Sequence, residues 1–146
     1  MNNDLTLKFE NYVVNNLQYS IENTSQYNIP QKTEKVNVYL NDIKASVSDD
    51  EKTVTLHFSV KIETDLKDKN NKAISFRHLK FDFNIFFSVK GKINKKSLSD
   101  ILKNLGINIA VTHIKDVVKS ITSVDYQNPI FISDIEFPND KIKPEN

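Results

Sequence analysis

The residues best suited to acid–base or metal chemistry are the three histidines, His57, His78 and His113. A zinc site or a general base needs such side chains grouped with one another or with carboxylates at short spacing. Here they are scattered, and the chain contains neither an HExxH motif nor a paired-histidine spacing. His57 also alternates with Leu56 and Phe58, which predicts that it faces the polar side of a strand. We therefore interpret the histidines as structural or solvent-facing.

The other reactive side chains form no constellation either. Asp49, Asp50 and Glu51 lack the EF-hand pattern and are typical of a solvated turn. The lysines of residues 90–96 are the main basic cluster; they could contact phosphate or an acidic partner, but a solvated loop is the simpler interpretation. There is no cysteine, no GxSxG motif and no glycine-rich phosphate loop. We expect no catalytic residue, no cofactor and no metal.

Composition narrows the class of protein further. With 146 residues the chain is long enough for one domain with a real core. The charges of twenty basic and nineteen acidic residues nearly cancel. The sequence therefore gives no electrostatic indication of binding to nucleic acid or anionic membranes. The first twenty residues contain charges and no uninterrupted apolar block, so we expect neither a signal peptide nor a membrane span. The absence of cysteine fits a reducing compartment, and we expect a cytoplasmic protein.

Alternating patterns predict four strands. Residues 5–22 alternate with a bulge near Asn15 and Asn16, and the polar residues 23–35 form a loop too long for a hairpin, which predicts a crossover. Residues 36–47 alternate with a phase slip at Asn41–Asp42, and a turn at 48–52 leads into a clean alternation at 54–62. After the charged residues 65–72, a Phe-rich strand spans 74–89 with a slip at Arg77–His78.

The last part of the chain has helical spacing. Ser97 is a good N-cap for a short helix through Leu105, and Gly106 stands where a C-cap glycine is expected. From Ile107, apolar residues recur every three or four positions over about 17 residues, which predicts one long amphipathic helix. The fold class is therefore α+β: a four-stranded antiparallel sheet with a long crossover after the first strand and both helices on one face. We expect one domain at residues 1–140 and a disordered tail at 141–146.

Such a sheet has more apolar area than one long helix covers. Part of the row Leu79, Phe81, Phe83, Ile85 and Phe87 is then expected to see water in a monomer. Self-association, with the helices between two sheets, would bury it. The alternative is that loops and the apolar segment 130–132 complete the core. We favour an oligomer, either a dimer or a tetramer.

The predicted order of strands and helices resembles that of SecB, the protein-export chaperone family. Residues 5–9 leading into 17–22 resemble the family's first strand, and the crossover, the hairpin and the Phe-rich strand follow in the same order. The helix region from Asn108 to Ser123, followed by Pro129–Ile130 and 134–137, gives the best match. The resemblance implies an ATP-independent holdase that binds unfolded or partly folded polypeptide, such as a preprotein or an antitoxin.

The sequence also departs from that family. Ile107 replaces a proline before the long helix, and Val111–Thr112 replaces a Phe-Pro pair within it. SecB proteins are strongly acidic and dock on the SecA motor through acidic sheet residues, whereas this chain is nearly neutral. Docking on SecA is therefore not expected, and relatives that guard antitoxins, or SecB-like proteins of Gram-positive bacteria and their mobile elements, fit better.

Two sets of residues follow from this hypothesis. The expected client contacts lie in the crossover loop, the second strand and the segment after the long helix: Tyr27, Ile29, Val36, Val38, Tyr39, Ile130 and Ile132. The expected subunit interface combines the first strand with the stripe of the long helix: Leu17, Tyr19, Ile21, Ile114, Val117, Val118 and Ile121.

Two other function classes stay open. A dedicated binding protein, such as an inhibitor or adaptor encoded by a phage or mobile element, would use the charged segments 65–72 and 90–96 more than a groove. An enzyme is the weakest hypothesis, because no catalytic constellation emerges.

Overall fold

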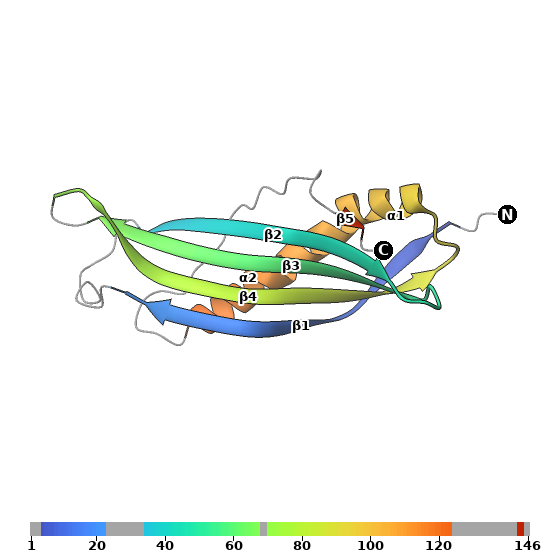
Figure 1. Ribbon diagram of the computed structural model, residues 1–146, viewed down its shortest axis with the longest axis horizontal. Coiled ribbons are helices and arrows are strands. Elements are labelled where there is room, and N and C mark those ends of the chain that lie inside the picture. Colours follow the sequence, from blue (N-terminus) through green and yellow to red (C-terminus); the bar gives the residue numbers. More distant parts are fainter. Residues whose placement is uncertain (1–3, 23–33, 68–69, 124–142, 145–146) are drawn as a thin grey trace.

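The computed structural model describes residues 4–22, 34–67, 70–123 and 143–144. Its sheet has the order β1-β4-β3-β2-β5, and the four long strands are antiparallel to their neighbours. They are β1 (Thr6–Ile21), β2 (Lys35–Val47), β3 (Thr53–Lys67) and β4 (Ala73–Lys90). β1 and β2 lie on opposite sides of the β3–β4 hairpin, so the chain crosses the sheet between them (Figure 1). The predicted α+β topology with its crossover is confirmed.

All three predicted phase slips are β-bulges. On β1, Asn16 and Leu17 together oppose a single residue of β4, and Asn16 has a φ of 54°. On β2 the slip lies between Asn41 and Lys44, and Asp42 has a φ of 51°. Two residues of β4, at positions 76 and 77, oppose the single residue 64 of β3. Each bulge lets the apolar side chains return to the same face after an extra residue.

The helical layer begins and continues differently from the prediction. α1 (Lys95–Ile101) begins two residues before Ser97, and its N-cap is Asn94, whose side chain accepts a hydrogen bond from the Ser97 N–H at 3.1 Å. A π-helical turn, η2 (Leu102–Gly106), then joins α1 to α2 (Ile107–Thr122). The prediction of a C-cap at Gly106 was wrong, because this glycine has helical angles of −60° and −44°.

Packing explains the glycine. A Cβ on Gly106 would lie 3.1 Å from the Leu102 Cδ2 and 3.8 Å from the Leu56 Cδ2 of β3. Gly106 therefore leaves room for the Leu102 side chain within the helical layer, whereas the distance to Leu56 is an ordinary van der Waals contact.

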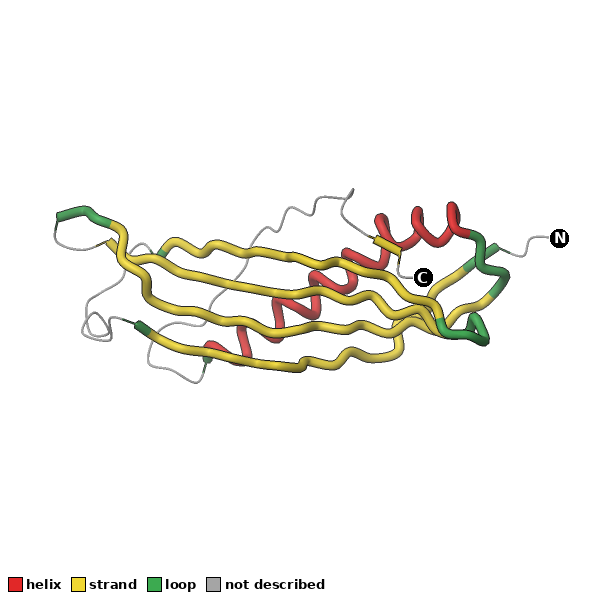
Figure 2. Tube along the Cα trace, viewed as in Figure 1, coloured by secondary structure: helices red, strands yellow, loops and turns green. Residues whose placement is uncertain are grey.

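The core lies between the sheet and the helices, which cover one face only (Figure 2). α2 crosses this face obliquely (Figure 1) and contributes Ala110, Ile114 and Val118 to the same buried cluster as β3 and β4. The expectation that part of the β4 row sees water was wrong, because every member of that row is at most 1% exposed: Leu79, Phe81, Phe83, Ile85 and Phe87. A helix that crosses the strands obliquely covers more of them than one aligned with them (Figure 1).

The fifth strand was not predicted. β5 (Lys143–Pro144) pairs in parallel with β2 at Lys44 and Ala45. Two residues of the segment expected to be a disordered tail thus extend the sheet beyond β2.

Candidate functional site

The exposed large apolar side chains of the described residues gather on the two outer long strands. Tyr12, Val13 and Leu17 lie on β1, and Tyr39 lies on β2, each between 37% and 48% exposed. Only Leu105, in the helical layer, is comparably exposed in the described part of the chain. The surplus apolar surface is therefore at the edges of the sheet and not on its central strands. Edge strands combine such side chains with unpaired main-chain groups, which is the chemistry needed to bind another chain.

The edge of β2 carries a row of apolar side chains on the core side. Val36, Val38 and Leu40 pair across the strands with residues 64, 62 and 60 of β3, and all three are only half-buried. Tyr39 points to the opposite face, where the Lys61 Nζ lies 5.9 Å from the centroid of its ring. Lys61 is also paired with a carboxylate oxygen of Glu63 at 3.0 Å. The β2 edge thus offers apolar contacts on one face and an aromatic ring beside a charge on the other.

Three of the predicted client contacts, Val36, Val38 and Tyr39, are brought together on this edge. The other four lie outside the described residues: Tyr27, Ile29, Ile130 and Ile132.

A second apolar feature is a groove of about 370 Å³ between β1 and the C-terminal half of α2, which we call the β1–α2 groove. Three β1 residues and four α2 residues line it: Tyr12, Val14, Leu17, Asp116, Val117, Ser120 and Ile121. The ring of Tyr12 stacks on the Phe83 ring with centroids 5.2 Å apart, and it lies tilted against the His113 ring at 5.1 Å. His113 also stacks on Phe9 at 4.5 Å, so this histidine has a packing role.

The predicted interface residues divide between this groove and the core. Leu17, Val117 and Ile121 line the groove. Ile114 and Val118 face the sheet and have no exposed surface, so here they belong to the core of the subunit. Tyr19 and Ile21, near the end of β1, are half-buried. Of the predicted interface residues, Leu17 is thus the one most exposed to a second copy.

Sequence reasoning missed Tyr12 and Val14 as groove residues. The reason is an irregularity at Glu10, which lies between the paired residues Phe9 and Asn11 of β1. It moves the core-facing positions from odd to even numbers, so Tyr12 and Val14 join Phe9 on the helix side. The signal was present in the sequence, since apolar residues occupy positions 5, 7 and 9 and then 12 and 14.

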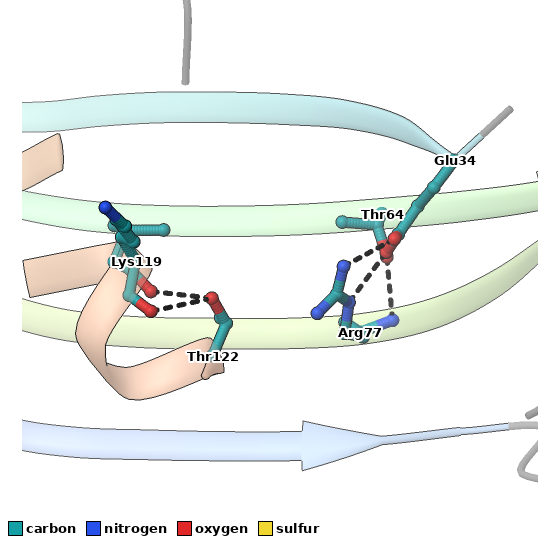
Figure 3. A network of polar contacts seen from close by, with 6 residues as sticks. Glu34, Thr64, Arg77, Lys119 and Thr122 are labelled. Atoms are coloured by element: carbon teal, nitrogen blue, oxygen red, sulfur yellow. Dashed lines mark hydrogen bonds and ion pairs between the residues drawn. The ribbon is translucent and has the colours of Figure 1, made fainter. Parts of the chain in front are cut away.

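One buried charge stands at the end of the sheet where β2 begins. Arg77 is 2% exposed, and its Nε donates to the Glu34 Oε2 at 2.7 Å (Figure 3). The Arg77 backbone N–H donates to the Thr64 hydroxyl at 3.0 Å. Burial lowers the pKa of Arg77, but its hydrogen bonds and charge interactions with Glu34 and Tyr19 outweigh this and raise the pKa above its ordinary value. The two side chains form a structural ion pair that joins β4 to the residue immediately before β2.

Apart from Tyr39 and a few other apolar side chains, the opposite face of the sheet carries polar groups. On it, Asp82 accepts hydrogen bonds from Asn16 at 2.7 Å and from Ser59 at 3.4 Å, and His57 is within 2.9 Å of the Asn84 side-chain oxygen. The described residues contain no group of three His, Cys, Asp or Glu side chains that could hold a metal ion. Among the described helices, none is both long and apolar enough to cross a membrane.

The charged segments on which a dedicated binding protein would rely overlap the ends of regular elements. β3 continues through Lys67 and α1 begins at Lys95, so the charged residues there belong partly to regular elements.

Comparison with known proteins identifies the fold. Neither a family profile nor a curated protein sequence matches the chain. Among solved structures, the SecB-like chaperone of Mycobacterium tuberculosis in complex with a ChAD peptide from the HigA1 antitoxin superposes with a TM-score of 0.67. The match covers 88% of this chain and 90% of that chain. This chain has a SecB-like fold.

The sequence identity to that SecB-like chaperone is 10%, so the likeness concerns the fold alone. A protein of unknown function from Streptococcus agalactiae covers 88% of this chain at 9% identity, but its TM-score of 0.40 carries no argument. The SecB-like arrangement is nevertheless what the order of the strands and the Phe-rich β4 predicted.

Proposed function

We propose that this protein is an ATP-independent holdase that binds extended, apolar segments of non-native polypeptide. The observation that carries this proposal is the concentration of exposed apolar side chains on β1 and β2, the outer long strands of the sheet. A client would bury these side chains and complete the hydrogen bonding of an edge strand at the same time.

The β2 edge is the proposed client site. Full burial of an aliphatic side chain contributes roughly 1.5–3 kcal/mol, so completing the burial of Val36, Val38 and Leu40 would contribute about 1 kcal/mol each. Tyr39 would add an aromatic contact on the other face. Contacts of this size give weak, sequence-tolerant binding, which suits a holdase with many clients.

The β1–α2 groove is the proposed subunit interface. It joins the exposed Leu17 to Val117 and Ile121 beside the outer edge of β1, which pairs with no described strand on that side. A second copy that placed its own β1 there would bury the same patch on both subunits, as a two-fold interface requires. We propose a homo-oligomer, either a dimer or a tetramer, on this basis.

The nature of the client follows from the same surfaces. The SecB-like neighbour was solved with a peptide from an antitoxin, which supports a polypeptide partner. An antitoxin segment, or another chain that has not yet folded, presents the extended apolar stretches that the β2 edge would bind. The near-neutral charge of the chain does not favour docking on SecA.

The test is protection of an aggregating protein. Insulin reduced with dithiothreitol is a suitable client, because the chain has no cysteine for the reductant to affect. We expect stoichiometric protein to suppress light scattering, and Tyr39→Ser to weaken this more than Val13→Ser, a change at a similarly exposed residue of β1. A complete lack of protection by the unmodified protein would overturn the proposal. Capture of one stoichiometric partner without any protection would favour a dedicated binding protein instead.

A further inference from the structure

The β2 edge already accepts an added strand. β5 pairs with β2 at Lys44 and Ala45, and its direction is parallel to β2. Within the described residues, no strand pairs with this side of β2 between positions 35 and 43. The occupied part of the edge is thus short and lies after the bulge at Asn41–Lys44, while the open part lies before it.

Burial along β2 follows the same division. Ile43 and Ala45, at and after the bulge, are 2% and 7% exposed. Val36, Val38 and Leu40, before the bulge, are half-buried although they lie on the same face. The part of β2 with open main-chain groups is therefore also the part with incompletely buried apolar side chains.

The composition of β5 suits a removable strand. It has only two residues, and Pro144 has no N–H to donate. Such a strand occupies an edge without presenting a continuous new edge of its own, which is one way that proteins prevent uncontrolled strand addition. A longer chain with all its N–H groups would pair along the whole of β2.

We propose that a client adds to β2 as a strand parallel to it, and that the protein's own residues 143–144 compete with the client for the pairing positions at Lys44 and Ala45. This inference rests on the proposed holdase function. It adds the place where the client binds, the direction of the client strand and a competing segment of the same chain. The client requirement is an extended segment with apolar residues at alternate positions, one set of which packs beside Val36, Val38 and Leu40.

Disulfide trapping tests which edge is used, because the chain has no cysteine of its own. The probe is a twelve-residue peptide of alternating valine and threonine with one terminal cysteine. Tyr39→Cys and Val13→Cys place a thiol at similarly exposed positions, 45% and 40%, on the two outer long strands. We expect Tyr39→Cys to trap the peptide at least fivefold faster. Equal or faster trapping by Val13→Cys would overturn the assignment to β2.

The direction is tested with two exposed lysines near the ends of β2. Lys35→Cys and Lys44→Cys remove the same charge from residues that are both solvent-exposed. For a parallel client, a cysteine at the peptide's N-terminus is trapped preferentially by Lys35→Cys, and one at its C-terminus by Lys44→Cys. The reverse pattern means an antiparallel client and overturns the proposal. N-methylation of the peptide at alternate residues removes N–H donors that strand pairing needs. If main-chain pairing holds the peptide on β2, this change should slow trapping about tenfold.

Competition by β5 is tested by deleting residues 141–146. The deletion should speed trapping at Lys44→Cys about threefold, because the fraction of protein with a free edge rises, and should leave trapping at Lys35→Cys unchanged. If Lys44→Cys traps the peptide at the same rate with and without residues 141–146, the proposed competition is wrong. If the unmodified protein protects insulin but trapping shows no preference for β2, the inference fails and the holdase proposal stands. If it neither protects insulin nor traps the peptide, both fail.

Discussion

Arg77 on β4 donates from its Nε to the Oε2 of Glu34, the residue immediately before β2, across a distance of 2.7 Å. The two residues are 43 positions apart, and the side chain of Arg77 is 2% exposed. The crossover ends at Glu34, so this ion pair fixes the start of β2 against β4. The half-buried row of the β2 edge begins two residues later, at Val36. The pair therefore connects the stability of the sheet to the position of the proposed client site.

Removing one partner of this pair is expected to be strongly destabilising. Arg77→Leu leaves the carboxylate of Glu34 without its charged partner, which typically costs about 3–5 kcal/mol of unfolding free energy. The measurement is urea-induced unfolding followed by circular dichroism. Glu34→Leu combined with Arg77→Leu should cost less than the sum of the two single changes, because neither charge is then left alone. A loss of less than about 1 kcal/mol for Arg77→Leu would contradict a structural ion pair.

Much of the fold could be predicted because the sequence contains local signals for it. Asn15–Asn16 and Asn41–Asp42 interrupt strict alternations, and Asn and Asp tolerate the left-handed backbone that two of the bulges adopt. The positions of these bulges determine which side chains of β1 and β2 face the helices. The β2 client residues could be placed for the same reason, since alternation through Val36 and Val38 defines a face.

The features that were mispredicted depend on contacts distant in sequence. Gly106 continues the helix and packs beside Leu56 of β3, and no local pattern distinguishes this from a C-cap. The burial of the β4 row depends on the oblique path of α2, which periodicity does not specify. The ion pair of Arg77 with Glu34 left no sequence signal either, since charged residues near a strand end usually remain in water.

The two glycines should respond differently to alanine. Gly91 has a φ of 96°, and a Cβ there would lie 2.6 Å from the Asp4 carbonyl oxygen, so Gly91→Ala should destabilise by about 2–3 kcal/mol. At Gly106 the backbone is helical, so the higher helix propensity of alanine stabilises the folded state by about 1 kcal/mol. This gain is opposed by a tight contact between the new Cβ and a methyl group of Leu102. Gly106→Ala should therefore stay within about 1 kcal/mol of the original protein. Thermal unfolding of both variants measures the difference. A larger loss of stability for Gly106→Ala than for Gly91→Ala would contradict the prediction.

The turn between β2 and β3 should weaken in acid. The Ser48 hydroxyl donates to the Asp50 Oδ1 at 2.6 Å and the Lys52 N–H donates to it at 3.0 Å; these bonds, the hydroxyl first, hold the pKa of Asp50 below its ordinary value of 3.8. A lowered pKa in the folded state means that the carboxylate stabilises the turn above that ordinary value and loses this effect as the pH falls through the lower, folded value.

Amide exchange in the turn measures this effect. At neutral pH the Lys52 amide should exchange faster in Asp50→Asn than in the original protein, because the amide oxygen is a weaker acceptor than a carboxylate. The difference, corrected for intrinsic exchange rates, should narrow as the pH falls below about 4. A difference that stays constant down to pH 2 would show that the charge of Asp50 does not hold the turn.

The proposed subunit interface is tested at Leu17, which is 48% exposed in the β1–α2 groove. Leu17→Asp places a charge among apolar side chains that a second copy would cover, so the mass from light scattering should fall towards that of the 16.8 kDa monomer. Leu105→Asp is the matched control, because Leu105 is 47% exposed but lies in the helical layer, outside the groove. If Leu105→Asp alone dissociates the assembly, the interface lies on the helices. An unmodified protein that is already a monomer at working concentrations would contradict the proposed interface in the β1–α2 groove.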